Sequence, residues 1–397
     1  MSAQDPLGLI EQGQSMISNL IGRGMEADSI RQLPSTTINE LIENNFFSIV
    51  APKRCGGFEY DLDILLAVVK QLGQGCGSTA WVTSLLGTHN WLAGLFSAKA
   101  QDELFADKNY LLAPAVFAPT GKAVKVNGGY RVSGCWSFAS GISHSNWIML
   151  SALLYDKAGE NAEENANVVG MECVVIPIGD ITVKDTWDTV GMRGTGSHDI
   201  EVDNVFVPQH RSIPFADVLS GNSPGAILSD NPIYRIPLVP YLSYTAAAPA
   251  LGIGFGALEQ FRTNMVDRVM LGGEQQQQKV ASQIRLGEAQ IALSAAEALM
   301  DRGVRDLLTK VKAGHTFSIE ERVNYRAEAC YVADSVKRVV DNLLEAAGAK
   351  AQFHAHPLQR FQRDINNLRG HVVFDMDSTM EMQGRSMIGL APNHALI

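Results

Sequence analysis

The segment 136–147 carries side chains that suit a flat aromatic ligand. It reads Trp-Ser-Phe-Ala-Ser-Gly-Ile-Ser-His-Ser-Asn-Trp, so it combines two indoles with four serine hydroxyls. Indole rings pack against other aromatic rings, and hydroxyls donate or accept hydrogen bonds at polar ring atoms. The pattern predicts that this segment lines the site of an aromatic cofactor.

A glycine-rich segment follows at 187–197 and reads Trp-Asp-Thr-Val-Gly-Met-Arg-Gly-Thr-Gly-Ser. Its glycines allow a ligand to approach the backbone closely, and Arg193 adds a cation with several hydrogen-bond donors. Neither segment decides a function by itself, but both suit contact with the same kind of ligand.

Two histidines are candidate acid–base groups, because imidazole titrates near neutral pH without help. His89 lies in an apolar helical stretch, where it either faces a ligand or is a hydrogen-bonded core residue. Arg360, Asp364 and His371 stand at i, i+4 and i+11, which on one helix places them within about 60° of one another. The alternative is a surface ion pair of Arg360 and Asp364 beside an incidental histidine.

Other motifs carry weaker signals. The segment Gly-Ile-Gly-Phe-Gly at 252–256 follows Pro249 in a helical region, so tight helix packing is favoured over dinucleotide binding. His354 and His356 are disfavoured as a metal pair, and we expect no metal site. The chain lacks the P-loop, G-x-S-x-G and H-E-x-x-H motifs, which removes the simplest support for phosphotransfer, serine hydrolysis and zinc proteolysis.

Hydrophobic periodicity divides the chain into helical, β and helical parts. We expect a helical domain over 1–112, a small β domain over 113–215, and a helical bundle with a preceding loop over 216–397. An Asn-Gly turn at 127–128 predicts a hairpin that leads into the 136–147 segment. Four helices are expected in the bundle, at 246–268, 276–313, 319–347 and 357–376.

The composition indicates a folded enzyme that acts on a small molecule. The chain has 397 residues, of which 46% are apolar, and a formal net charge of −10, which argues against nucleic acid or an anionic membrane as the main partner. Its five cysteines are isolated in sequence, so we expect free thiols. The sequence shows no secretory signal and no long apolar span, and we expect a cytoplasmic location.

The element order and three motifs together resemble the acyl-CoA dehydrogenase superfamily. The motifs are the segments 136–141 and 187–197 and the stretch His-Pro-Leu-Gln-Arg-Phe-Gln-Arg-Asp at 356–364. The catalytic glutamate that the dehydrogenases carry in a late Glu-Gly-Thr stretch has no counterpart, since the chain contains no such tripeptide. The chain is therefore more similar to the flavin-dependent monooxygenase branch, and within it to oxygenase components of two-component aromatic hydroxylases.

This resemblance implies an α+β fold with an N-terminal helical domain, a small central β-barrel or sandwich domain and a C-terminal antiparallel four-helix bundle. It further implies reduced FMN or FAD supplied by a separate flavin reductase, dioxygen as co-substrate, a flavin hydroperoxide and a homotetramer. The implied activity is hydroxylation of a small aromatic compound, phenolic or indole-like. Alternatives are N- or S-oxidation on the same fold, acyl-CoA dehydrogenation, or a catalytically silent flavin-binding protein.

The resemblance also assigns roles to individual residues. Ser140 is expected near the reactive nitrogen of the flavin, with Trp136 and Phe138 forming the surrounding wall. His89 is assigned to the substrate and His371 to the peroxide, with the reverse division as the alternative. Further cofactor contacts are expected from Arg193, Gly194, Thr195, Ser197 and, across a subunit interface to a cofactor phosphate, Arg268. The substrate pocket is expected to include the loop 210–240, Trp91, Tyr241 and Tyr244.

Overall fold

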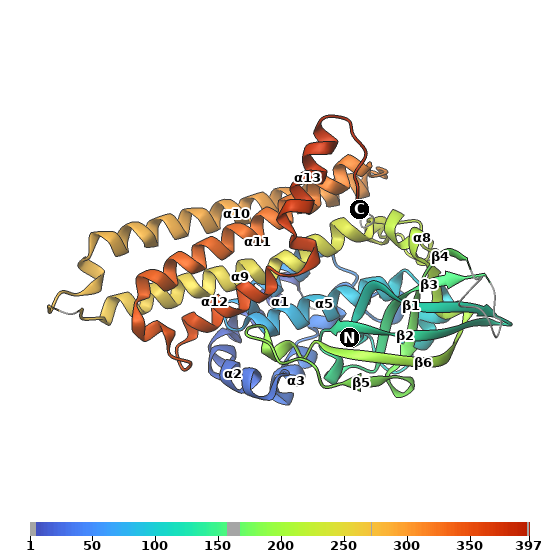
Figure 1. Cartoon of the computed structure of the whole chain (residues 1–397), viewed down its shortest axis with the longest axis horizontal. Helices are drawn as coiled ribbons and strands as arrows, with labels where there is room; N and C mark the ends of the chain where they lie inside the picture. The colour runs from blue at the N-terminus through green and yellow to red at the C-terminus, as the bar shows by residue number, and fades with distance from the viewer. Residues whose placement is uncertain (1–4, 157–166, 271, 395–396) are drawn as a thin grey trace.

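The computed structural model describes residues 5–156, 167–270, 272–394 and 397. Figure 1 shows a β-sheet at one end of the molecule and a bundle of long helices that extends away from it, with the N-terminal helices packed beneath. The order of elements along the described chain is helical, then β, then helical, as the periodicity predicts.

Six helices precede the sheet. They are α1 (Pro6–Ser15), α2 (Ile17–Ile30), α3 (Ser35–Glu43), α4 (Leu62–Gly73), α5 (Gly77–Gly94) and α6 (Ala98–Leu104). All residues of α5 are buried except Leu85, so this helix contacts protein on every side. It carries His89 and the neighbouring tryptophans through the middle of the molecule, because its small residues allow other elements to pack closely around it.

Within the described residues, the strands form one seven-stranded sheet. They are β1 (Ala115–Val126), β2 (Gly129–Ala139), β3 (Trp147–Tyr155), β4 (Val168–Pro177), β5 (Thr182–Lys184), β6 (His198–Pro208) and β7 (Ser212–Pro214), in the spatial order β5-β6-β2-β1-β3-β4-β7. The predicted hairpin is confirmed as the antiparallel pair of β1 and β2, in which Val126 lies opposite Gly129. β1 and β3 are the parallel pair of this sheet.

The apolar side chains form two separate clusters. One lies within the sheet and is centred on strands β1 to β4 and β6, and the other extends through the N-terminal helices and the bundle. The Trp136 indole is 1% exposed in the sheet cluster, and its Nε1 donates to the Ser151 carbonyl at 2.9 Å. Gly121 makes room for it, because a Cβ there would lie 1.9 Å from the indole ring. Trp136 therefore packs inside the β domain, and its placement on a cofactor wall is corrected.

The C-terminal part contains α8 (Phe215–Ser220), α9 (Leu238–Asp267), α10 (Val280–Lys312), α11 (Ile319–Ala347), α12 (Pro357–Leu368) and α13 (Met376–Met387). Helices α9 to α12 lie side by side, and α13 projects from the bundle on the side of the sheet (Figure 1). α9 begins eight residues earlier than predicted, with Pro240 in its first turn, where the missing N–H costs nothing.

The expected helix over 357–376 is wrong in its second half. α12 ends at Leu368, and a short 3₁₀ turn at Val372–Phe374 separates it from α13. The side chain of His371 accepts from the Val373 N–H and so caps this turn instead of continuing the helix. His371 therefore does not share a helix face with Arg360 and Asp364.

Among the described helices, α9 alone is long and apolar enough to cross a membrane by length and composition, and 89% of its most apolar window is buried inside the molecule. It is the central helix of the bundle. The helix-packing interpretation of the 252–256 segment is confirmed, because a Cβ at Gly252 would lie 2.6 Å from the Gly73 Cα of α4. The two helices thus meet backbone to backbone.

All five cysteines are free thiols. Burial raises the pKa of Cys55 to about 11 and that of Cys173 to about 12, and it also raises the pKa of Cys76 and of Cys330. Cys135 is exposed on β2.

Candidate active site

Three hydroxyls from the two predicted cofactor segments form a continuous hydrogen-bonded chain. Ser140 Oγ lies 2.8 Å from Ser197 Oγ, which lies 2.6 Å from Thr195 Oγ1. The Trp81 Nε1 of α5 donates to Ser140 Oγ at 3.1 Å, and Thr195 Oγ1 donates to the Met192 carbonyl at 2.8 Å. We call Ser140, Ser197 and Thr195 the hydroxyl chain. It joins the ends of β2 and β6 to α5.

The backbone around Ser140 is shaped to present this hydroxyl. Phe138 has a φ of 71°, which is strained for a bulky residue, and the Ser140 N–H donates to the Phe138 carbonyl at 2.9 Å. The Gly141 N–H donates to the Thr195 carbonyl at 2.8 Å, so the two segments are also held together by their backbones. Strain of this kind is often found at functional sites.

His371 lies against the same tryptophan that bonds to Ser140. Its ring centre is 5.3 Å from that of Trp81, in an edge-to-face arrangement, and 6.1 Å from that of Phe374. Burial and the nearby Arg326 guanidinium lower the pKa of His371 to about 4, so the ring is neutral at neutral pH. Trp81 thus connects the predicted flavin contact to a predicted catalytic histidine.

Hydrogen bonds fix which nitrogen of His371 carries the proton. Nδ1 accepts from the Val373 N–H at 3.3 Å, so the proton of the neutral ring is on Nε2. Within the described residues Nε2 has no hydrogen-bond partner. The ring therefore offers a donor.

His89 has the opposite arrangement. Its Nδ1 lies 2.7 Å from the Ala113 carbonyl oxygen, which only accepts, so the proton is on Nδ1 and Nε2 carries a lone pair. Burial lowers the pKa of His89 to about 4. No described residue bonds to Nε2, and the ring therefore offers an acceptor. His89 is thus a hydrogen-bonded core residue through Nδ1, and its Nε2 is still able to bind a ligand.

A hollow of about 450 Å³ lies between the 187–197 segment and α12, and its lining extends to Gly370, the residue before His371. It is lined by Val190, Gln362, Arg363, Asn366, Asn367 and Gly370. Val190, in this lining, is 77% exposed. Phe138 lies outside the lining; it is 68% exposed and packs edge-on against Trp187 of the 187–197 segment. Exposed apolar side chains beside amide donors and acceptors fit a flat heterocycle with a polar edge, as a flavin has. The residues present therefore fit the predicted cofactor.

Two other predicted cofactor residues in the 187–197 segment are used for packing and ion pairing. Arg193 donates to Asp188, to the Thr189 carbonyl and to the Asp28 carbonyl of α2. Gly194 is buried, and a Cβ there would lie 3.0 Å from the Ser78 Cβ. Arg193 thus anchors the segment to the N-terminal helices.

Arg268 immediately follows α9, which ends at the side of the bundle away from the sheet (Figure 1). Its Nη1 donates to the Ala347 carbonyl, at the end of α11, and to Gln276 Oε1. Nε and Nη2 have no partner among the described residues. Within a single subunit, Arg268 therefore does not contact the hydroxyl chain.

The predicted substrate aromatics form a buried group at the start of α9. The Trp91 and Tyr241 rings stack with centres 3.9 Å apart, and Trp91 Nε1 donates to the Ile233 carbonyl at 2.9 Å. The Tyr241 hydroxyl is buried with no partner among the described residues. The Tyr244 hydroxyl donates to Glu328 at 2.9 Å. Of the two tyrosine hydroxyls, that of Tyr241 is the one without a partner among the described residues.

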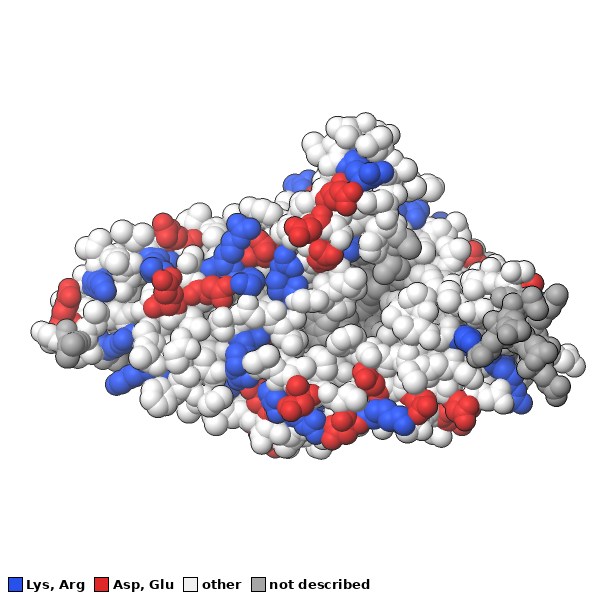
Figure 2. Space-filling model, viewed as in Figure 1, with Lys and Arg blue, Asp and Glu red and all other residues white. Residues whose placement is uncertain are grey.

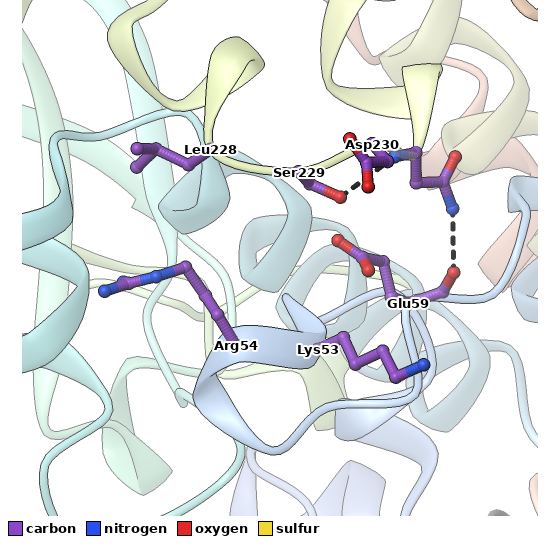
Figure 3. Close-up of a pocket in the computed structure, with 7 residues that line it drawn as sticks. Lys53, Arg54, Glu59, Leu228, Ser229 and Asp230 are labelled. Carbon is purple, nitrogen blue, oxygen red and sulfur yellow. Dashed lines mark hydrogen bonds between the residues drawn. The ribbon is translucent and has the colours of Figure 1, made fainter.

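The loop before α9 lines a second hollow, of about 380 Å³, at the surface. Figure 3 shows Lys53, Arg54 and Glu59 facing the 228–231 segment, with Asn231 Nδ2 donating to the Glu59 carbonyl at 2.9 Å. This hollow shares no lining residue with the one beside His371. None of its lining residues belongs to the hydroxyl chain, and neither His89 nor His371 lines it.

Asp364 is a buried group whose role the sequence pattern does not reveal. Its Oδ1 accepts from the Met192 N–H at 2.7 Å, and its side chain is 1% exposed. Burial raises the pKa of Asp364 to about 7. Arg360 is also buried and donates to the Ile21 carbonyl, so the alternative of a surface ion pair between Arg360 and Asp364 is wrong. Asp364 holds the 187–197 segment against α12.

Trp81 is the functional candidate that sequence reasoning missed. Its apolar neighbours mark it as a core residue, and only its spacing of two helical turns from His89 hints at a shared face. Among the described residues, no group of three or more histidine, cysteine, aspartate or glutamate side chains is placed to hold a metal. On the face shown in Figure 2, acidic and basic side chains are interspersed along the bundle and the lower edge.

Comparison with known proteins agrees with this geometry. Residues 244–376 match the family model described as acyl-CoA dehydrogenase, C-terminal domain. The structure of XiaF from Streptomyces sp., in complex with FADH2 and glycerol, superposes with a TM-score of 0.90 at 28% identity and covers 99% of this chain and 98% of that chain. The predicted fold is confirmed, and fold and site together define a flavoprotein of the acyl-CoA dehydrogenase type.

Two relatives narrow the class. A pigment production hydroxylase of Rhodococcus sp. is 32% identical over 390 residues, covering 98% of each chain. The oxygenase subunit HsaA of a flavin-dependent monooxygenase of Rhodococcus jostii is 30% identical over 378 residues, covering 95% of this chain and 97% of its own. The chain belongs to the flavin-dependent monooxygenases of this superfamily, as the oxygenase component of a two-component system.

Proposed function

We propose that the protein hydroxylates a small aromatic compound, phenolic or indole-like, with reduced flavin supplied by a separate reductase and with dioxygen. The observation that carries this proposal is the opposite tautomers of two histidines, of which His89 is buried and His371 is half-buried. His89 offers an acceptor at Nε2 and His371 offers a donor at Nε2. Hydroxylation of a phenol needs both, one at the substrate hydroxyl and one at the oxygen that is transferred.

Reduced flavin, when bound, supplies the electrons that activate dioxygen. Ser140, held by the Trp81 N–H, would bond to the reactive edge of the ring. The α12 amides of Gln362, Asn366 and Asn367 would bind its polar rim, and Phe138 and Val190 would pack on its apolar surface. FMN and FAD share this ring, so the same residues would serve both.

His89 accepts a hydrogen bond from the substrate hydroxyl. A phenol has a pKa of about 10, and drawing its proton toward Nε2 raises electron density on the ring carbons. Because burial lowers the pKa of His89 to about 4, the ring is an unprotonated acceptor throughout the neutral range. The Tyr241 hydroxyl and the stacked Trp91 are the proposed neighbours of the substrate.

His371 donates through Nε2 to the oxygen that is transferred. The neutral imidazole keeps its proton on Nε2, and a fixed N–H donor stabilises negative charge that develops on the oxygen. The Trp81 ring orients His371, and the Val373 N–H holds the tautomer.

We also propose a cytoplasmic homotetramer in which Arg268 reaches a flavin phosphate of a neighbouring subunit. Two donor positions of its guanidinium, Nε and Nη2, are unused by the described residues, and a guanidinium matches the geometry of a phosphate. Light scattering of the purified protein would measure the assembly, and a monomer would contradict this part of the proposal.

The activity is tested by combining the protein with a flavin reductase, NADH, FMN or FAD, and a panel of phenols, indoles and thioethers. We expect oxygen-dependent hydroxylation of a phenol or an indole, detected by mass spectrometry with ¹⁸O₂. Oxidation at sulphur alone would favour the heteroatom alternative. Absence of oxygenated product together with acyl-CoA oxidation by a dye acceptor would contradict the proposal.

A further inference from the structure

We infer that the hydroxyl chain has a fixed direction, and that this direction makes Ser140 an acceptor that selects reduced over oxidised flavin. Ser197 and Thr195 are then positioning residues, because they act on the flavin only through Ser140. The inference rests on the proposed function in one respect, since it takes Ser140 as the partner of the flavin N5 nitrogen.

The two ends of the chain set its direction. The Trp81 indole N–H only donates, so Ser140 Oγ must accept at that end. The Met192 carbonyl only accepts, so the Thr195 hydroxyl donates at the other end. Between these ends, the Ser197 proton is directed to Thr195 and the Ser140 proton is directed to Ser197. All three hydroxyl protons are then used inside the protein.

The reverse direction costs one hydrogen bond. If Thr195 donated to Ser197 and Ser197 to Ser140, the Ser140 proton would point to the ligand, and the Thr195 bond to the Met192 carbonyl would be lost. Thr195 is 2% exposed and Ser197 is 3% exposed, so water does not replace that bond. Ser140, at 6% exposed, is the hydroxyl of the chain with most access to a ligand.

The remaining lone pair of Ser140 matches one redox state of the flavin. N5 of reduced flavin carries a hydrogen and donates, whereas N5 of oxidised flavin has only a lone pair and accepts. Reduced flavin therefore bonds to Ser140 with the chain in its favoured direction. Oxidised flavin either meets two facing lone pairs or forces the reversal.

The test is the ratio of the dissociation constants of oxidised and reduced FMN, measured by fluorescence titration in air and by anaerobic titration. We expect a ratio well above one in the unmodified protein. Ser197→Ala frees the Ser140 proton to donate to N5, so oxidised FMN should bind more tightly and the ratio should fall by roughly five- to tenfold. Thr195→Val should lower the ratio in the same way, and Thr195→Ser should restore it.

Thr189→Val is the matched control, because the Thr189 hydroxyl donates to the Gly191 carbonyl in the same segment but outside the chain. Its ratio should equal that of the unmodified protein. A ratio that stays constant in Ser197→Ala and Thr195→Val, or equal weakening of both redox states, would overturn the inference while leaving the flavin site intact. Failure of the unmodified protein to bind reduced FMN would instead overturn the proposed function.

Discussion

The two ends of the helical bundle differ in how their polar groups are used. At the end near the sheet, His89 and His371 each bond to the protein through one ring nitrogen, and the other has no partner among the described residues. Ser140 bonds to Trp81 and to Ser197 and keeps one lone pair. At the far end, His356 uses both ring nitrogens, since Nδ1 accepts from the Leu358 N–H and Nε2 bonds to Asn264.

Residue type alone therefore does not mark a site. Of the three histidines compared, only His89 and His371 keep a ring nitrogen with no partner among the described residues. Arg268, at the far end, combines both kinds of use: its Nη1 bonds to protein, whereas Nε and Nη2 have no partner among the described residues. The comparison can be tested by removing matched residues from the two ends.

The largest effect is expected from His371→Ala. Loss of the Nε2 donor should lower the rate of product formation by about 100-fold or more, in the range of general acid–base catalysis. His356→Ala is the control, since His356 caps the start of α12 as His371 caps the short turn that follows its end. Its rate should stay within about twofold of the original. Equal losses in the two variants, measured with a reductase under saturating reduced flavin, would remove the distinction between the ends.

A smaller effect is expected from Ser140→Ala. Without this acceptor the reduced ring is held less firmly, so more of the consumed oxygen should leave as hydrogen peroxide, by roughly tenfold relative to product. Ser145→Ala provides the control, because the Ser145 hydroxyl only donates to the Gly141 carbonyl. Peroxide and product would be quantified in the same reaction. An unchanged ratio in Ser140→Ala would place the flavin elsewhere.

Arg268→Lys should raise the dissociation constant of reduced FMN several-fold, because lysine lacks the paired donors that suit a phosphate. Riboflavin, which has no phosphate, should bind equally well to both proteins. Arg262, exposed in an ion pair with Glu259 near the same end, supplies the control variant Arg262→Ala. Equal changes in the dissociation constants of FMN and riboflavin would show that Arg268 has a structural role and does not bind the phosphate.

The smallest effect is expected in the pH dependence of stability, through Asp364 between the two ends. The pKa of Asp364 in the folded protein, about 7, lies above its value in the unfolded chain. The stability that protonated Asp364 contributes to the fold is therefore fully present below about pH 4 and is lost as pH rises through 7. The depressed pKa values of His89 and His371 act oppositely, adding stability as pH rises from about 4 to 6.5.

Asp364→Asn keeps an acceptor for the Met192 N–H but does not titrate. Its free energy of unfolding, relative to the original protein, should therefore increase between pH 5 and pH 7.5. Urea denaturation at the two pH values measures this difference. A difference that is constant with pH would show that Asp364 is already ionised in the folded protein at pH 5.

Sequence reasoning predicted those features that depend on periodicity and on local motifs. The alternation of the strands and the Asn-Gly turn at 127–128 give the hairpin, and the long apolar periods give the bundle. The same alternation could have predicted that Trp136 points into the β domain, since successive strand residues face opposite sides of a sheet. The motif was instead taken as one surface, with all its side chains facing the cofactor.

The remaining features depend on contacts between distant segments. Met192 and Asp364 are 172 positions apart in the chain, and Trp81 and Ser140 are 59 apart. Helical spacing also fails at His371, because the helix ends at Leu368 and the histidine caps the next turn. No period in the sequence encodes such an ending.

The burial of the cysteines has a consequence for a protein that handles dioxygen. Hydrogen peroxide attacks thiolates and reacts only slowly with thiols, so a raised thiol pKa protects a cysteine from sulfenic acid formation. Four of the five cysteines are kept protonated in this way, among them Cys55 and Cys173 with pKa values of about 11 and about 12. We therefore expect these four thiols to resist peroxide, and Cys135, exposed on β2, is the cysteine most accessible to it.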